Sequence, residues 1–332
     1  MLEHIAGKNE LNVLILSCGT RNKIVQYFKR ELAGRGLVVA TDCSDLAPAL
    51  YEADRHYVVP RIDTDGYLNA VLRICEENGI KIVLSLIDPE LSLLAKNRGL
   101  FLEMGVLPVV SDFDVVELCF DKYRMACFLT ANGFRTARTY DSREEFYSDV
   151  DAGLLYYPVF VKPRKGSASA NTYVVQSKEE LDLLFDRFDD LIIQELMTGR
   201  EYGADVYVDM ITGQVVSVFT KEKLKMRAGE TDKSVSVVDE ALSQLIVDFV
   251  SRLGLRGVVD IDIFSTNGDY YISEVNPRFG GGYPHAHECG VNIVSMILNN
   301  AQGIPNSPQM CAYEQDVYMM KFNEVLIKRR LL

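Results

Sequence analysis

Two carboxylates and an amide stand close together in the strongly apolar segment 257–283. Asp262 lies among alternating apolar residues, an Asn-Gly pair follows at 267–268, and Glu274 and Asn276 then stand two residues apart. Asn-Gly is typical of a tight β-hairpin turn, and residues two apart on a strand project to the same face. We therefore expect the hairpin to gather hard oxygen ligands, the type that Mg²⁺ prefers in proteins.

Acidic residues on a hairpin can also be no more than its solvated face. Here the acids lie within apolar strands, and Arg278 and a glycine run at 280–282 follow directly. Glycine lets a backbone approach a ligand closely, which a solvated face does not need. The pattern favours a site for a metal and a phosphate over a solvated face.

A second segment suited to anions begins where an apolar strand ends at Lys162. Arg164 and Lys165 come next, and the run 166–171 consists of small residues. Small side chains allow backbone N–H groups to close over an anion, while the lysines neutralise its charge. Because the run joins two strands, we predict a flexible flap over phosphates, with an ordinary hairpin loop as the alternative.

The segment 191–197 is predicted to be an apolar strand, and a Thr-Gly turn follows it directly. Such a junction can present backbone N–H and C=O groups to an adenine edge, with Leu196 and Met197 against the ring. Glu201 is then placed to accept hydrogen bonds from ribose hydroxyls.

Two further positions combine a structural interpretation with a substrate role. Arg227 lies in the charged segment 221–234, which is predicted to be a surface loop, yet its guanidinium could hold an acyl phosphate or carboxylate bidentately. Asp88 precedes Pro89, a residue favoured at the first position of a helix, so Asp88 is predicted to cap that helix. A substrate-facing Asp88 or Glu90 is the alternative, since open α/β sheets gather ligands after their strands.

Alternating strands and helices occupy residues 1–112 and predict a Rossmann-like parallel layer. The expected strands are 12–17, 37–41, 57–60, 81–85 and 106–110, and the expected helices are 23–33, 68–77 and 91–104. The loop 17–22 has one glycine instead of G-x-G-x-x-G, which disfavours a dehydrogenase. Asp42 is accordingly interpreted as a cap or loop residue. Further helices are expected at 115–132, 239–253 and 284–299, with a strand at 317–322.

The composition describes an ordinary globular protein: 332 residues, 48% hydrophobic and 25% charged. A net charge of -12 argues against a nucleic-acid partner. No signal peptide and no membrane span are expected, and seven scattered cysteines without a CxxC pair fit reduced thiols in a cytoplasm. Oligomeric state is left open, with a homodimer or a partner chain as the alternatives.

The motifs between Asp121 and Arg278, in this order, resemble the ATP-grasp superfamily. Nearly the whole chain resembles a single-module protein similar to half of the carbamoyl-phosphate synthase large chain. The resemblance implies an α/β protein: a Rossmann-like pre-ATP-grasp domain at 1–112 followed by two α+β subdomains that clasp ATP. These would be a lid with the phosphate flap at 113–195 and a C-terminal subdomain with the metal-binding hairpin at 196–332.

The resemblance also assigns roles to individual residues. For ATP it implies Lys122, Lys162, Lys165, Gly166, Ser167, Ser169, Gln194, Glu195, Leu196, Met197 and Glu201. For Mg²⁺ (or Mn²⁺) it implies Asp262, Glu274 and Asn276. Arg278 would steady the transferred phosphate or the intermediate, and Lys162 and Arg227 are the other candidate catalytic residues.

The implied activity is a ligase that activates a carboxylate as an acyl phosphate and joins it to an amine. The carbamoyl-phosphate synthase pattern has a histidine in the substrate loop, where this chain has Arg227-Ala228-Gly229, a difference that suits a larger carboxylate than bicarbonate. A split half of a carbamoyl-phosphate synthase, acting on bicarbonate or carbamate, is the second hypothesis. A non-catalytic ATP-binding module is the third, although it would not need all three metal ligands.

Overall fold

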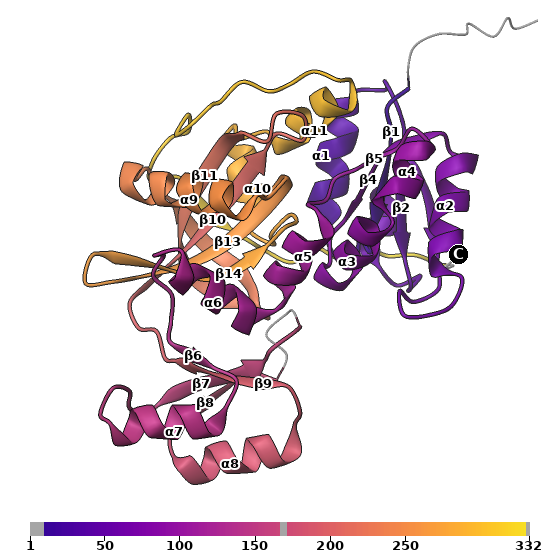
Figure 1. Cartoon of the computed structure of the whole chain (residues 1–332). Coiled ribbons are helices and arrows are strands. Elements are labelled where there is room, and N and C mark those ends of the chain that lie inside the picture. Colours follow the sequence, from indigo (N-terminus) through magenta and orange to yellow (C-terminus); the bar gives the residue numbers. More distant parts are fainter. Residues whose placement is uncertain (1–9, 167–170, 330–332) are drawn as a thin grey trace, which may run out of the picture.

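A computed structural model describes residues 10–166 and 171–329, and within them the chain forms three sheets (Figure 1). The first sheet is five-stranded, the second four-stranded and the third six-stranded. The Rossmann-like layer and the two following α+β units that the sequence predicts are confirmed. The domain boundaries at 112/113 and 195/196 stay a prediction. No helix in the described ranges is long and apolar enough to cross a membrane.

The N-terminal sheet is parallel, with strand order β3-β2-β1-β4-β5. Its strands are β1 (Asn12–Leu16), β2 (Val38–Asp42), β3 (Arg55–Val58), β4 (Ile80–Ser85) and β5 (Leu107–Pro108). Its helices are α1 (Asn22–Leu32), η1 (Pro48–Glu52), α2 (Tyr67–Glu77), α3 (Asp88–Lys96) and α4 (Arg98–Glu103). The helix expected at 91–104 is thus two helices, divided at Asn97. Asp42, expected to be a cap or loop residue, is the last residue of β2, and its carboxylate accepts the N–H of Gly19 in the loop after β1 at 2.8 Å.

The four-stranded sheet has the order β6-β9-β7-β8 and carries two helices of its own. Its elements are β6 (Thr139–Tyr140), α7 (Arg143–Asp151), β7 (Val159–Pro163), β8 (Tyr173–Val175), α8 (Lys178–Arg187) and β9 (Leu191–Glu195). The helix expected at 115–132 is wrong as a single element, since it forms α5 (Phe113–Phe120) and α6 (Lys122–Ala131).

The break between α5 and α6 lies at Asp121, whose carboxylate caps α6 by accepting the N–H of Arg124 at 3.0 Å. The same carboxylate pairs with Arg164, just after β7, at 2.9 Å. The N–H of Lys122 also donates to the carbonyl of Arg164 at 3.1 Å. The break therefore fixes Lys122 at the start of a helix and beside the strand that carries Lys162.

The six-stranded sheet has the order β14-β13-β10-β11-β12-β15. Its elements are β10 (Arg200–Val208), β11 (Val215–Arg227), β12 (Glu230–Ser236), α9 (Glu240–Leu253), β13 (Gly257–Thr266), β14 (Asp269–Asn276), α10 (Tyr283–Glu288), α11 (Ile293–Ala301) and β15 (Tyr318–Met320). The helix expected at 284–299 is divided into α10 and α11 around Gly290, which has a φ of 93°. The surface loop expected at 221–234 is instead most of the β11–β12 hairpin. Two of its lysines face carboxylates: Lys221 pairs with Asp205 on β10, and Lys223 pairs with Asp262 on β13.

One buried carboxylate ties this sheet to α11. Asp209, just after β10, is fully buried and accepts hydrogen bonds from Asn300 at 2.7 Å, Thr212 at 2.8 Å and the Asn306 N–H at 2.8 Å. Burial opposes its charge, but these hydrogen bonds outweigh it and hold the pKa of Asp209 well below its usual range. Asp209 is therefore a structural anion.

We expect Asp209→Asn to lower the free energy of unfolding by roughly 2–4 kcal/mol at pH 7, because an amide replaces a buried acceptor that faces only donors. A depressed pKa stabilises the fold above the unfolded value of about 3.9 and loses this effect as pH falls toward the folded value. The difference between the two proteins should therefore shrink below about pH 4. Urea unfolding across pH checks this, with exposed Asp63→Asn as the control. A loss that does not change with pH would contradict it.

Candidate active site

A cavity of about 690 Å³ is lined by residues of all three sheets and their loops. The N-terminal layer contributes Arg21 and Asp88, the four-stranded sheet contributes Lys162, and the β13–β14 hairpin contributes Asp262 and Glu274. The site therefore exists only when the three units are assembled.

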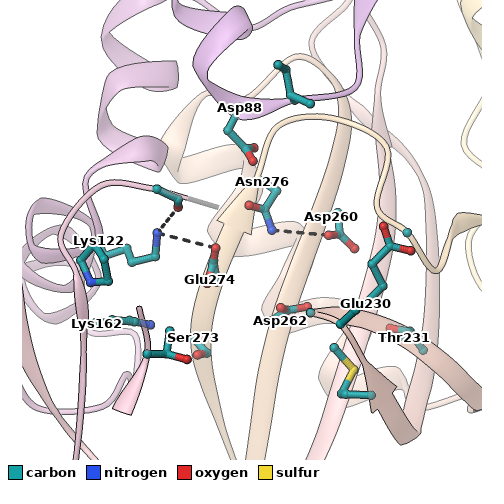
Figure 2. Close-up of a pocket in the computed structure, with 18 of the residues that line it drawn as sticks. Asp88, Lys122, Lys162, Glu230, Thr231, Asp260, Asp262, Ser273, Glu274 and Asn276 are labelled. Atoms are coloured by element: carbon teal, nitrogen blue, oxygen red, sulfur yellow. Dashed lines mark hydrogen bonds and ion pairs between the residues drawn. The ribbon is translucent and has the colours of Figure 1, made fainter. Parts of the chain in front are cut away.

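The β13–β14 hairpin forms one wall of this cavity. Asp262 lies opposite Glu274 and Asp260 lies opposite Asn276 in the antiparallel register, and all four line the cavity (Figure 2). The structure thus brings the three predicted metal ligands together. It adds Asp260, which the predicted set omits although it stands two residues before Asp262 on the same strand. Burial, followed by the charges of Asp262 and Asp205, raises the pKa of Asp260 to about 7.

The donor set fits Mg²⁺ that arrives with a phosphate, but not a metal held by protein alone. Among the described residues, no three His, Cys, Asp or Glu side chains cluster as metal ligands. Asp262 and Glu274 supply two carboxylates and Asn276 an amide oxygen, and Mg²⁺ commonly takes one or two carboxylates with phosphate oxygens and water. Each of the two carboxylates forms an ion pair with a lysine: Lys223 Nζ lies 2.6 Å from Asp262, and Lys122 Nζ lies 3.8 Å from Glu274.

Lys162 is a buried cation beside this wall, with 6% of its surface exposed. No carboxylate of the described residues lies within the 4.0 Å of an ion pair to it, and burial lowers its pKa, with a further lowering by Lys122. Glu274 acts in the opposite direction. A buried charge without a close partner is costly, so its position favours an anionic ligand.

Lys122 and Lys165 are the other cations on this side of the cavity. The Lys122 ammonium donates to the Gly166 carbonyl at 2.6 Å, so it reaches the start of the predicted flap. Lys165 is about half-exposed, 3.8 Å from Glu117. Gly166 lines the cavity with a φ of 136°, a backbone conformation that favours glycine. The predicted flap residues Ser167 and Ser169 lie outside the described residues.

The predicted adenine hinge is not among the residues that line the cavity. Gln194 donates its amide to Thr139 on β6 at 2.9 Å, and Glu195 accepts the N–H of Arg138 at 3.3 Å. Both side chains are used to hold β9 against β6, while Leu196 and Met197 are half-buried. The hinge role of these four residues stays a prediction.

Glu201, the predicted ribose acid, lines the cavity, where Lys223 Nζ lies 2.8 Å from it. Lys223 is 3% exposed and joins Glu201 to Asp262. Burial disfavours its charge, but Asp262 and Glu201 outweigh burial and raise its pKa above the usual range. The sequence prediction missed Lys223 because its segment was interpreted as a loop. The period-two spacing of Lys221, Lys223 and Lys225 is the signal that could have found it.

Arg227 is not among the residues that line the cavity: its guanidinium lies 2.8 Å from Asp232 and the side chain is 49% exposed. Its catalytic role stays a prediction. The role predicted for Asp88 needs correction. Asp88 does not cap its helix, which begins after Ile87 with no side-chain cap. Asp88 lines the cavity and pairs at 2.9 Å with Arg278, whose guanidinium lies 3.8 Å from Asp260. Figure 2 shows Asp88 beside Asn276, where it faces the site.

The fold and the site define an α/β protein with a phosphate- and metal-suited cavity between a Rossmann-like layer and two α+β units. Family models agree: a PylC-like N-terminal domain matches residues 13–110, and an ATP-grasp domain matches residues 119–282. The chain thus carries an ATP-grasp domain, preceded by a PylC-like N-terminal domain.

Relatives of this chain include carbamoyl phosphate synthase large chains and D-alanine–D-alanine ligases. The large chain of Thermoplasma acidophilum is 25% identical over 246 residues, which cover 68% of this chain and 23% of that protein. The D-alanine–D-alanine ligase of Bacillus licheniformis is 32% identical over 156 residues, 42% of this chain and 43% of that one. The matched part of this chain thus spans less than half the length of either relative.

Solved structures share the fold. One is the biotin carboxylase domain of Hydrogenobacter thermophilus 2-oxoglutarate carboxylase, in complex with MgADP and bicarbonate. It superposes with a TM-score of 0.73 at 20% identity, and the match covers 92% of this chain and 73% of that structure. The L-amino acid ligase of Bacillus licheniformis has a TM-score of 0.68 at 22% identity and covers 91% and 76%. At these identities the likeness shows the fold alone.

Proposed function

We propose that this chain is an ATP-dependent ligase that activates a carboxylate as an acyl phosphate and joins it to an amine. The observation that carries the proposal is the juxtaposition of Asp262 and Glu274 with Lys122 and with Lys162 on one cavity. Lys162 is buried and has no ion-pair partner among the described residues. Opposite charges at this spacing suit a metal–phosphate ligand, and catalysis of phosphoryl transfer rests on such positioning and electrostatics.

Lys122 and Lys162 would hold phosphate oxygens, and Asp262, Glu274 and Asn276 would hold the metal. Arg278 would orient the substrate carboxylate. Bound ATP with Mg²⁺ supplies the phosphoryl group and neutralises its charge. The net reaction converts ATP, a carboxylate and an amine into ADP, phosphate and an amide.

A second candidate is a carbamoyl-phosphate synthase-like half that phosphorylates bicarbonate or carbamate, favoured by the similarity to the large chains of that enzyme. Bicarbonate would need only a small anion site. The cavity instead continues past Arg278 to Asp88, Arg21 and Glu230, which leaves room and charge for a larger substrate.

Release of ADP and phosphate from ATP and Mg²⁺ tests the proposal, screened over pairs of one carboxylic acid and one amine. Turnover that requires both partners and yields the amide by mass spectrometry is the expected result. Turnover with bicarbonate and no amine would favour the second candidate. Tight ATP binding without turnover under any pair would reduce the chain to an ATP-binding module and overturn both.

A further inference from the structure

Two ion pairs join the N-terminal layer to the six-stranded sheet at the cavity. The N-terminal layer supplies the cation of one pair and the anion of the other. Arg21, in the loop after β1, places Nη2 2.9 Å from Glu230 Oε1 on β12. Asp88, at the start of α3, places Oδ2 2.9 Å from Arg278 Nη2, just after β14. All four side chains line the cavity, and we call them the inter-layer cluster.

The cluster is charged but close to neutral as a group. Lys321 of the C-terminal segment pairs with Glu230 at 2.8 Å, and Asp260 lies 3.8 Å from Arg278. With these two neighbours, three cations face three acids. A ligand that carries a single charge would leave one sign of this set without a partner, whereas a ligand that carries both signs would match it.

The hydrogen bonding of the Asp88–Arg278 pair is incomplete. The side chains are 8% and 11% exposed, yet Asp88 Oδ1 and Arg278 Nε have no hydrogen-bond partner among the described residues. A buried polar atom without a partner costs roughly 1–3 kcal/mol. Such an atom in a protein is commonly explained by a function, here a ligand group that completes the pair.

The Arg21–Glu230 pair is built into the backbone around it. A Cβ at Gly281 would lie 2.7 Å from Arg21 Nη1 and 2.8 Å from Glu230 Oε2, so any larger residue would displace the pair. The glycine therefore lets the chain after β14 pass directly beside two charged side chains at the cavity. A chance contact between layers would not need this close approach.

We propose that the inter-layer cluster is a subsite for an α-amino acid, whose carboxylate faces Arg278 and whose ammonium group faces Asp88 and Glu230. An α-amino acid carries both charges on neighbouring atoms, which matches the alternation of the cluster. Arg278 also adjoins the hairpin wall, so the carboxylate held there stands beside the predicted metal ligands. The inference rests on the proposed function, because it names the carboxylate that the ligase would activate.

Binding can be measured without turnover, by isothermal titration calorimetry of the full chain saturated with Mg²⁺ and a non-hydrolysable ATP analogue. Each of the standard L-amino acids is the probe, followed by the des-amino acid and the decarboxylated amine of the tightest binder. We expect an amino acid to bind and each analogue to bind at least about 10-fold more weakly. Failure of every amino acid to bind, or equal affinity for the des-amino acid, would overturn the proposal.

Variants separate recognition from a structural role of the ion pair. Asp88→Asn and Glu230→Gln, which each remove a carboxylate that faces the ammonium group, should each raise the Kd of the amino acid at least about 10-fold and leave the affinity for the ATP analogue within about 2-fold. The exchanged pair, Arg21→Glu with Glu230→Arg, restores the contact between layers and should restore the melting temperature but not amino-acid binding. Full recovery of binding in the exchanged pair would show that the contact is only structural and would overturn the subsite.

The two proposals can fail separately. An amino acid that binds but never promotes ADP release leaves the subsite standing and removes the ligase. ADP release with acids that carry no amino group leaves the ligase standing and removes the subsite. The same titrations and the release assay therefore assign the failure to one of them.

Discussion

Replacement of Glu274 by alanine is expected to lower ADP release by at least about 10³-fold, or about 4 kcal/mol of transition-state stabilisation. Glu274 lies opposite Asp262 on the hairpin and 3.8 Å from Lys122. Its loss leaves Asp262 as the one carboxylate of the three predicted metal ligands and removes the counter-charge that holds Lys122 at the wall. The rate of ADP release under saturating ATP and Mg²⁺ measures the effect.

Glu274→Gln sharpens this test because it keeps the shape of the side chain and removes its charge. We expect it to lose activity nearly as completely as the alanine variant, since Mg²⁺ needs an anionic oxygen. Exposed Glu76→Ala on α2 is the matched control and should keep full activity. Wild-type rates in Glu274→Gln would show that the carboxylate holds no metal, and an unchanged melting temperature excludes unfolding as the cause of a loss.

Part of the hairpin wall was predictable because its information is local. The Asn-Gly turn joins the two strands, and the two-residue spacing of Glu274 and Asn276 places both on one face. The strand that presents Lys162 is likewise a local pattern. The predicted β–α alternation of the N-terminal layer also needs only local hydrophobic patterns. The register at the site was not predictable in this way: the turn alone would place Asp262 opposite Ser273, and a bulge between Asp262 and Ile263 shifts the pairing by one residue, so that Asp262 lies opposite Glu274.

The errors arise where distant contacts override a local pattern. Residues 115–132 have the periodicity of one helix, yet Asp121 leaves the helix to cap α6 and to pair with Arg164. Lys221 and Lys223 look solvated in sequence but are buried against acids from β10 and β13. Local charge density predicts a loop there, and only the sheet order reveals the partners.

The substrate side of the cavity was the least predictable part. Arg278 meets Asp88 across 190 positions of the chain, and no pattern near either residue indicates the contact. The sequence predicts that Asp88 caps a helix, because an aspartate directly before a proline is typical of a helix N-terminus. Docking of the N-terminal layer onto the six-stranded sheet turns it instead into part of the cavity.

Lys162→Met is expected to lower kcat/KM for ATP by about 10²–10³-fold, because a preorganised cation in a water-poor site stabilises the transferred phosphoryl group strongly. The same variant should have a higher melting temperature than the parent. Burial lowers the pKa of Lys162, so the folded protein binds the Lys162 proton less tightly than the unfolded chain does. The charged lysine therefore lowers the free energy of unfolding at neutral pH, and its removal should raise it. A side chain that weakens the fold while it supports catalysis is typical of a functional site. Lys178→Met, on the surface of the same unit, is the control for both measurements.

The lowered pKa also gives the sign of a pH effect on nucleotide binding. As pH rises toward the unfolded value of about 10.5, free Lys162 loses its proton first, whereas the phosphates of a bound nucleotide would keep it protonated. Affinity for MgADP should therefore fall as pH rises through the lowered pKa, and binding in that range should take up a proton. Calorimetry in two buffers of different ionisation enthalpy measures the uptake. If Lys162→Met still takes up the same proton, the cation that meets the phosphates is a different residue.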